Sequence, residues 1–455
     1  MRIHNPTITG SFTISGSNLN IDSSGNITTL GSLTAAEYTV SSSVTALTIT
    51  TASGSGAFGD TQDDIHRFTG SLEIRGSRID FEDGYNSVAI GRNALASRTS
   101  GEGNIGIGYN AGDAITTAQG NVAIGYSALS AEDTGGGTVA IGYKSLEVQN
   151  GDGQNIGIGT QTATRNTTGT RNILIGYQAG FGAISANWSN NIGIGRQALY
   201  SLQGSGDHNV AIGNSAGFNI TTGDYNIIIG NDDGMTMTTT ANTVLIGYQA
   251  GDAINSADAD GTVAIGHQAG TAITSGQESV LIGRQAGQTL TTGDANTAVG
   301  HYALYHNVTG NRNTAIGRGA GARFLNDDST ALGYYAGHYA SGSSNTFLGS
   351  YAGQGGTTSA PYSSGTSNVA VGYYAMRVFT TAYSNTVMGV NAGDAITSGY
   401  QNAIFGQGAG GSLTDGHDNV IIGASAGTTT TSVGSAVIIG DFAGGSGDIT
   451  DAADG

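Results

Sequence analysis

Residues 121–129 read Asn-Val-Ala-Ile-Gly-Tyr-Ser-Ala-Leu, and residues 172–180 repeat the pattern as Asn-Ile-Leu-Ile-Gly-Tyr-Gln-Ala-Gly. This motif occurs 21 times between Asn86 and Gly444. We call the glycine that follows its aliphatic run the closing glycine. Most closing glycines are 17 residues apart, and the exceptions are 16, 18, 19 or 23. Such a period over some 350 residues predicts a stack of 21 similar rungs.

The three residues before each closing glycine are short, apolar and rich in β-branched side chains, which is typical of a strand. The remainder of each copy is turn-like, as in residues 220–226, Ile-Thr-Thr-Gly-Asp-Tyr-Asn. No window keeps apolar residues at helical spacing for three turns. The predicted fold class is therefore all-β, a parallel β-solenoid. With strands about 4.8 Å apart, 21 rungs would make a rod roughly 100 Å long.

Three positions of the repeat carry nearly constant residue types. The fourth residue before the closing glycine is Asn in 14 copies, which predicts an amide ladder between rungs. The closing glycine suits a positive φ or a close backbone approach. Ala follows it by three residues in 18 copies, which predicts tight packing. The residues assigned this structural role in representative copies are Asn121, Ile124, Gly125, Ala128, Asn172, Ile175, Gly176, Ala179, Asn226, Ile229 and Gly230.

Neighbouring side chains of a strand point to opposite faces. The residues one and three before the closing glycine, here the flanking positions, are mostly Ile, Val or Thr, and we expect them to face the inside of the coil. The residue between them, the middle position, is never polar. We expect it to form an outer apolar stripe that packs against other copies of the chain. A monomeric solenoid with a two-layered core is the alternative.

Composition excludes several other classes of protein. The 455 residues include 78 Gly but only 2 Pro, which excludes collagen, and no Cys, which excludes disulfides and cysteine zinc sites. The net charge of −18 disfavours binding to nucleic acid, because phosphates would be repelled. The abundant Tyr and β-branched residues disfavour a disordered glycine-rich chain.

The stretch Asn-Ser-Val-Ala-Ile-Gly at residues 86–91, followed by Ala94 and Ala96, resembles the head repeat of YadA-like trimeric autotransporter adhesins. Similar repeats occur in phage tail fibres and other virion fibres. The resemblance covers about four-fifths of the chain and implies a left-handed parallel β-roll in which three chains pack side by side.

The chain departs from those adhesins at both ends. It opens Met-Arg-Ile-His-Asn-Pro without the apolar core of a secretory signal, and its last residues, 448–455, are acidic and unlike a membrane-spanning strand. We therefore expect a non-enzymatic, homotrimeric fibre of a phage virion, without a cofactor. The alternative is a bacterial cell-surface adhesin or extracellular filament subunit. An ice-binding solenoid is disfavoured, because the Thr-Thr pairs of this chain lie in predicted turns and form no flat array of Thr-x-Thr strands.

Three segments are expected: residues 1–85 as a β-rich attachment or capping segment, 86–444 as the repeat shaft, and 445–455 as a flexible acidic tail. Within the first, residues 7–14 and 45–50 alternate Thr or Ser with aliphatic residues, as strands do. This segment would join the fibre to a virion attachment protein, and the shaft would present loops to an unknown host-surface receptor.

Other candidate sites are weaker. Glycine patterns such as Gly106, Gly108 and Gly112 recur with the repeat and lie in no βαβ unit, so a dinucleotide site is disfavoured. The eight histidines are scattered, and His267 and His301 are expected in solvent. The acids at 232–233 and 258–260 could hold Ca²⁺ but fit solvated turns better. The lengthened rungs at 181–190, 256–261 and 354–367 are natural recognition loops. They make Trp188 and Tyr362 candidate contact residues.

Overall fold

The computed structural model describes residues 19–21, 27–29, 85–151, 153–183 and 187–445. The chain divides into two compact units, residues 1–79 and 80–455. In the first unit, β1 (Leu19–Ile21) pairs antiparallel with β2 (Ile27–Thr29). The strands expected at residues 7–14 and 45–50 lie outside the described residues, as does the tail from residue 446.

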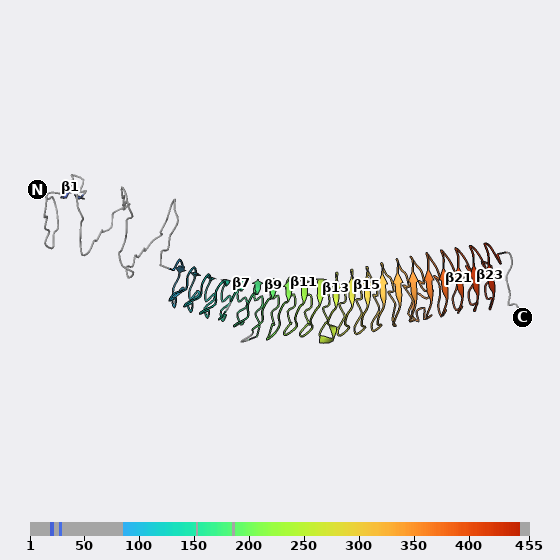
Figure 1. The fold of residues 1–455 in the computed structure, drawn as a ribbon, viewed down its shortest axis with the longest axis horizontal. Coiled ribbons are helices and arrows are strands. Elements are labelled where there is room, and N and C mark those ends of the chain that lie inside the picture. The colour runs from blue at the N-terminus through green and yellow to red at the C-terminus, as the bar shows by residue number, and fades with distance from the viewer. Residues whose placement is uncertain (1–18, 22–26, 30–84, 152, 184–186, 446–455) are drawn as a thin grey trace. The chain divides into compact units, whose positions relative to one another are not determined.

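The second unit is a parallel β-solenoid, which confirms the predicted fold class. Its strands are three residues long, except for β11 and β12, which have five. Each pairs in parallel with the next in sequence (Figure 1). The strands are β3 (Val88–Ile90), β4 (Ile105–Ile107), β5 (Val122–Ile124), β6 (Val139–Ile141), β7 (Ile156–Ile158), β8 (Ile173–Ile175), β9 (Ile192–Ile194), β10 (Val210–Ile212), β11 (Ile227–Asn231), β12 (Val244–Tyr248), β13 (Val263–Ile265), β14 (Val280–Ile282), β15 (Thr297–Val299), β16 (Thr314–Ile316), β17 (Thr330–Leu332), β18 (Thr346–Leu348), β19 (Val369–Val371), β20 (Thr386–Met388), β21 (Ala403–Phe405), β22 (Val420–Ile422) and β23 (Val437–Ile439).

The turns between strands also stack, because their backbones hydrogen-bond from rung to rung. Gly112 N–H donates to the Ala128 carbonyl at 2.9 Å, for example. The lengthened rung at 256–261 holds a short 3₁₀ helix, η1 (Ala257–Ala259). Main-chain pairing therefore runs along much of each rung, although the strand itself is only three residues long in most rungs.

Each rung bends through residues with positive φ. The closing glycines described between Gly91 and Gly440 have φ from +122° to +157°, a region in which other residues are strained. The second and fourth residues after them are left-handed as well, as at Ser127 (φ +50°) and Leu129 (φ +52°). Single non-glycine residues tolerate this region at a cost of about 1–2 kcal/mol. The inter-rung hydrogen bonds that these bends permit offset that cost.

The expected assignment of the two strand faces is wrong. The middle position points into the solenoid, and Ala123, Leu174 and Phe347 are fully buried there. The flanking residues face outward and are half-buried or exposed in every described strand of the solenoid. The reason is size. One rung encloses room for only one layer of side chains, so the position that tolerates Ala and Gly lies inside and the bulkier pair lies outside.

Two positions share the remaining core volume, the fourth and the seventh after the closing glycine. Where the fourth is Leu, the seventh is polar in most rungs, as with Leu129 and Glu132, whereas Leu199 and Leu202 are both apolar and fully buried. Where the fourth is Gly, as at Gly217, a long apolar residue such as Ile220 fills the space. A Cβ added to Gly217 would lie 2.9 Å from Ile220 Cδ1. In a rung such as this one, with Gly at the fourth position, the seventh residue therefore supplies the core side chain, and the interior stays closely packed.

Replacing a closing glycine should destabilise the solenoid more than replacing a turn glycine that has open space around it. In Gly108→Ala the new Cβ would lie 2.5 Å from the Gly125 carbonyl oxygen, at φ +132°. We expect the free energy of unfolding to fall by at least about 3 kcal/mol. The control Gly120→Ala has φ +67° and no atom within 4 Å, so about 1 kcal/mol is expected. Equal losses of thermal stability in the two variants would contradict the close-approach argument.

Candidate self-association face

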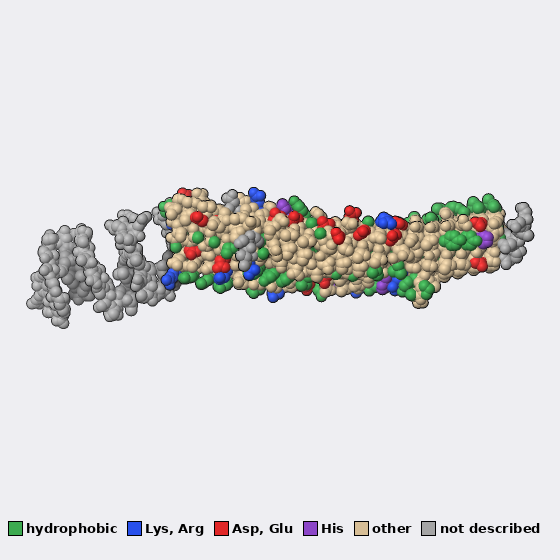
Figure 2. All heavy atoms as spheres, turned by 90° about the horizontal axis from the view of Figure 1, so that it is seen from below, with side chains coloured by type: hydrophobic (Ala, Val, Ile, Leu, Met, Phe, Trp, Pro, Cys, Tyr) green, Lys and Arg blue, Asp and Glu red, His purple; other side chains and the backbone are tan. Residues whose placement is uncertain are grey.

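The outward flanking side chains form a mainly aliphatic face along β3–β23, with Thr at the first flanking position of β15, β16, β17, β18 and β20. We call it the outer aliphatic face. Because each strand pairs in register with the next, side chains one rung apart lie directly above one another, as Val122 does above Val139. Eight residues immediately before closing glycines are classed as exposed: Ile90, Ile282, Ile316, Leu332, Leu348, Met388, Ile422 and Ile439. Figure 2 shows hydrophobic side chains along the lower edge of the solenoid and at the C-terminal end of the upper edge, with charged side chains along the rest of the upper edge and over the side drawn.

Tyrosines border this face where they directly follow the closing glycine. Tyr109, Tyr126 and Tyr143 stack with ring centroids 5.1 and 5.4 Å apart, and all three are exposed. Tyr177 and Tyr248 occupy the same position in later rungs. Contiguous apolar patches of more than a few hundred Å² are unusual on monomeric soluble proteins.

The predicted asparagine ladder is confirmed. Asn121 N–H donates to Asn104 Oδ1 at 2.9 Å, and Asn121 Oδ1 accepts the Thr138 N–H at 2.9 Å. Its Nδ2 donates to the Gly135 carbonyl, again at 2.9 Å. Asn121 is fully buried and all its polar groups are satisfied, which such a position requires. Asn172 and Asn226 make equivalent bonds.

The other assigned repeat residues also occupy distinct structural positions. Ala128 and Ala179 are fully buried, as the tight-packing argument predicts. The closing glycines Gly125, Gly176 and Gly230 have φ of +133°, +135° and +155°. Ile124, Ile175 and Ile229 point outward from their strands and are half-buried, so they belong to the outer aliphatic face instead of the core.

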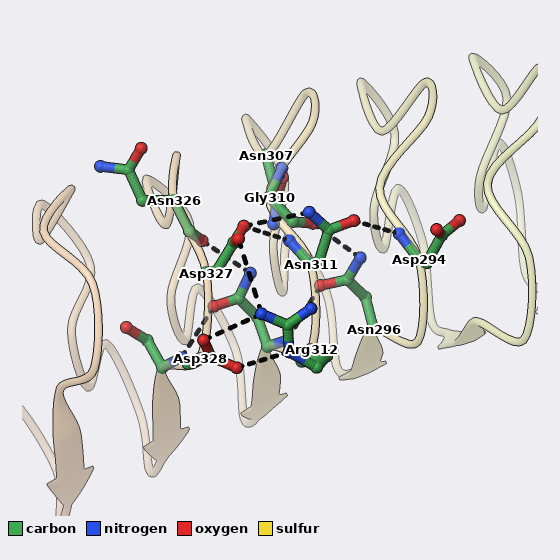
Figure 3. A network of polar contacts seen from close by, with 11 residues as sticks. Asp294, Asn296, Asn307, Gly310, Asn311, Arg312, Asn326, Asp327 and Asp328 are labelled. Atoms are coloured by element: carbon green, nitrogen blue, oxygen red, sulfur yellow. Dashed lines mark hydrogen bonds and ion pairs between the residues drawn. The ribbon is translucent and has the colours of Figure 1, made fainter.

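A second polar ladder, which sequence reasoning missed, runs along the turns two residues before the asparagines (Figure 3). Asp294 N–H donates to Asn311 Oδ1, and Asn311 N–H donates to Asp327 Oδ1, both at 2.8 Å. Arg312 binds Asp328 through two hydrogen bonds of 2.6 and 2.9 Å. Much of the acidic excess in these turns therefore caps backbone N–H groups. Asp260 does the same for Ala241 N–H at 2.7 Å.

Two carboxylates are buried in the core. Asp233, expected in a solvated turn, occupies the position that is Ala in most rungs and is fully buried. Its Oδ1 accepts the Ala250 N–H at 3.1 Å, and its Oδ2 has no hydrogen-bond partner. Burial raises the pKa of Asp233 to about 7. Burial likewise raises the pKa of Glu132 to about 7, although the Gly135 and Gly151 N–H groups bind its Oε1. For Asp233, its place at the position that is otherwise almost always Ala was the signal of burial that the sequence offered.

The two candidate recognition residues differ in outcome. Trp188 is fully buried, so its assignment as a surface contact is wrong. Its ring fills the core beside Gly180 and Gly182, where a glycine leaves room for a large side chain. Tyr362 is half-buried on the longest inserted loop, with the Arg323 guanidinium 4.6 Å from its ring centroid.

Over the described ranges no group of three or more His, Asp or Glu side chains is placed to hold a metal ion. Within the same ranges, no helix is long and apolar enough to cross a bilayer. His267 is exposed as expected, whereas His301 is half-buried, stacks on Tyr302 at 3.9 Å and has a pKa lowered by burial.

Comparison with protein-family models, with curated proteins and with solved structures finds no significant match to this chain.

The buried acid Asp233 should make the solenoid less stable as the pH rises. Its folded-state pKa of about 7 exceeds the ordinary value of 3.8, so the folded chain holds the proton more tightly than the unfolded chain. This contribution to stability is greatest below about pH 4 and is lost towards pH 7. At pH 8, Asp233→Ala should stabilise the protein by about 1–3 kcal/mol and flatten the pH dependence of its thermal midpoint.

The half-buried neighbour provides the control for this experiment. Asp232→Asn removes the same formal charge and should change the slope of thermal midpoint against pH much less, because Asp232 is only half-buried. If both variants flatten the slope equally, the effect comes from net charge and not from burial of Asp233.

Proposed function

We propose that this chain is a structural fibre subunit whose outer aliphatic faces pack together in a homotrimer, giving a rigid rod in a phage virion. The observation that carries the proposal is the outer aliphatic face itself. It follows the described strands of the solenoid, and its side chains repeat in register. Burying it against two identical faces would remove the apolar surface from water at about 25 cal/mol per Å².

The interior supports association and not a larger single-chain core. The middle position, together with the fourth and seventh residues after the closing glycine, already fills the inside of the rungs, and Ala211, Leu245 and Ile404 are fully buried there. No second layer within the described rungs covers the flanking residues. A partner surface of the same period is the simplest cover, because only a copy of this chain matches the rung spacing over the whole length.

A mechanical role fits the way the rungs are connected. Each is joined to the next by strand pairing, by the asparagine ladder and by turn hydrogen bonds. Contacts are therefore between neighbouring rungs, as in other solenoids. The many contacts between each pair of rungs make the rod resist bending. The virion assignment rests on the resemblance of the repeat to fibre and adhesin repeats.

The oligomeric state tests the interface. Wild-type protein should sediment at about three times the 45.5 kDa chain mass. The double variant Leu332→Lys with Leu348→Lys places charges on the outer aliphatic face and should sediment as a single chain, because an unpaired buried charge is prohibitively costly. Val308→Lys is the control, since Val308 lies on a turn and is as exposed as Leu348 (44% and 43%).

A wild-type protein that sediments as one chain would refute the trimer. If Val308→Lys also dissociated the trimer, the outer aliphatic face could not be identified as its interface. Immunogold electron microscopy of native particles tests the virion role separately. Label along fibres of phage particles is expected. Label confined to bacterial surfaces would favour an adhesin instead.

A further inference from the structure

One segment of the shaft contains no acidic residue, although the chain has 33. Residues 329–393 include neither Asp nor Glu, yet they hold eight of the 20 tyrosines. At the average density of the chain, a stretch of this length would carry about four or five acids. In a protein with a net charge of −18, these rungs therefore lack negative side chains and are richer in tyrosine than the rest of the chain.

The tyrosines of this segment touch one another across consecutive rungs. Tyr335 and Tyr351 stack with centroids 5.8 Å apart, and Tyr351 lies 5.1 Å from Tyr374. Tyr334 and Tyr373 flank them and are 40% and 45% exposed. Their faces are thus open to solvent over three rungs.

Two arginines lie beside this surface. Arg323 is placed over the ring of Tyr362, and the Arg377 guanidinium lies 4.7 Å from the Tyr374 ring centroid. Neither forms an ion pair with a carboxylate among the described residues, and Arg377 Nε is buried without a hydrogen-bond partner. Burial raises the pKa of Asp394, and the positive charge of the nearby Arg377 opposes this rise.

The inserted loop joins the two arginines into one surface. Gly355 N–H donates to the Arg377 carbonyl at 2.9 Å, and Tyr339 N–H donates to the Gln354 carbonyl at 2.7 Å. Ser363 N–H in turn donates to the Tyr339 carbonyl at 3.1 Å. In Figure 2, hydrophobic, basic and histidine side chains lie together near a small protrusion on the lower edge. We call Arg323, Tyr362, Tyr374, Arg377 and loop 354–363 the acid-free patch.

We propose that the acid-free patch binds an anionic saccharide. Tyr362 and Tyr374 are half-buried, and the exposed ring of Tyr373 lies beside Tyr374. Such rings offer flat apolar surface to the C–H face of a sugar, and a guanidinium binds a carboxylate or sulfate through paired hydrogen bonds. Because the backbone of these rungs is already paired with its neighbours, the patch offers no free strand edge for an added peptide strand. Two arginines are too few for a nucleic acid backbone against the overall negative charge.

This inference rests on the proposed attachment role and says which part of the rod recognises a surface. The test is titration calorimetry of the full chain with tetragalacturonate and with a heparin tetrasaccharide, which carry carboxylates and sulfates. Binding of at least one is expected. Arg323→Gln should weaken it about tenfold, as loss of one charge-assisted pair would. Methyl-esterified tetragalacturonate should bind more weakly than the free acid by a similar factor.

Arg312→Gln is the matched control, since Arg312 is an exposed arginine held by Asp328 on another turn. It should bind the saccharide within twofold of wild type. Four results would overturn the proposal: no binding of either probe, equal loss in Arg312→Gln, equal affinity for the methyl ester where the free acid binds, or tighter binding of hexaglutamate. Sedimentation of the same samples reports the trimer independently, so failure of the patch and failure of self-association are distinguishable.

Discussion

At the closing glycines one rung approaches the next too closely for any side chain, and the rest of the structure depends on this repeated contact. A Cβ added to Gly108 would meet the carbonyl of Gly125, and the same holds from each described closing glycine to the next, up to Gly423. Close contact there lets Gly125 N–H reach the Ile107 carbonyl at 2.8 Å. With any side chain at this corner the rungs would separate, and the asparagine ladder would lose its register.

The small cross-section of a rung has a second consequence, for the surface. An interior one side chain wide takes its residues from the middle strand position and from the fourth or the seventh residue after the closing glycine, or from both, as at Leu199 and Leu202. Ile124 and its counterparts are then left outside, where an apolar side chain is unfavourable unless something covers it. A long apolar surface is thus the direct result of a thin core, so the self-association proposed above would follow from the fold itself.

Much of this was predictable from local patterns. The period, the strand positions, the role of Asn121 and the buried Ala128 all follow from residue types that recur at fixed spacing. Which strand positions face the interior was not predictable, because the middle and flanking positions are both mostly apolar and alternation alone cannot say which is inside. Trp188 and Asp233 were also misjudged. Each breaks the repeat once, and a single departure carries no periodic signal of its surroundings.

The sequence by itself determined the rung: its length, its strand, its glycine corner and its amide ladder. These are set by neighbours within about 17 residues and by chemistry that each copy repeats. Only the tertiary structure decided which apolar face is interior and that an arginine lies over Tyr362. It also decided that Asp233 is buried. These features depend on how much volume a closed rung encloses and on which residues of distant rungs come into contact.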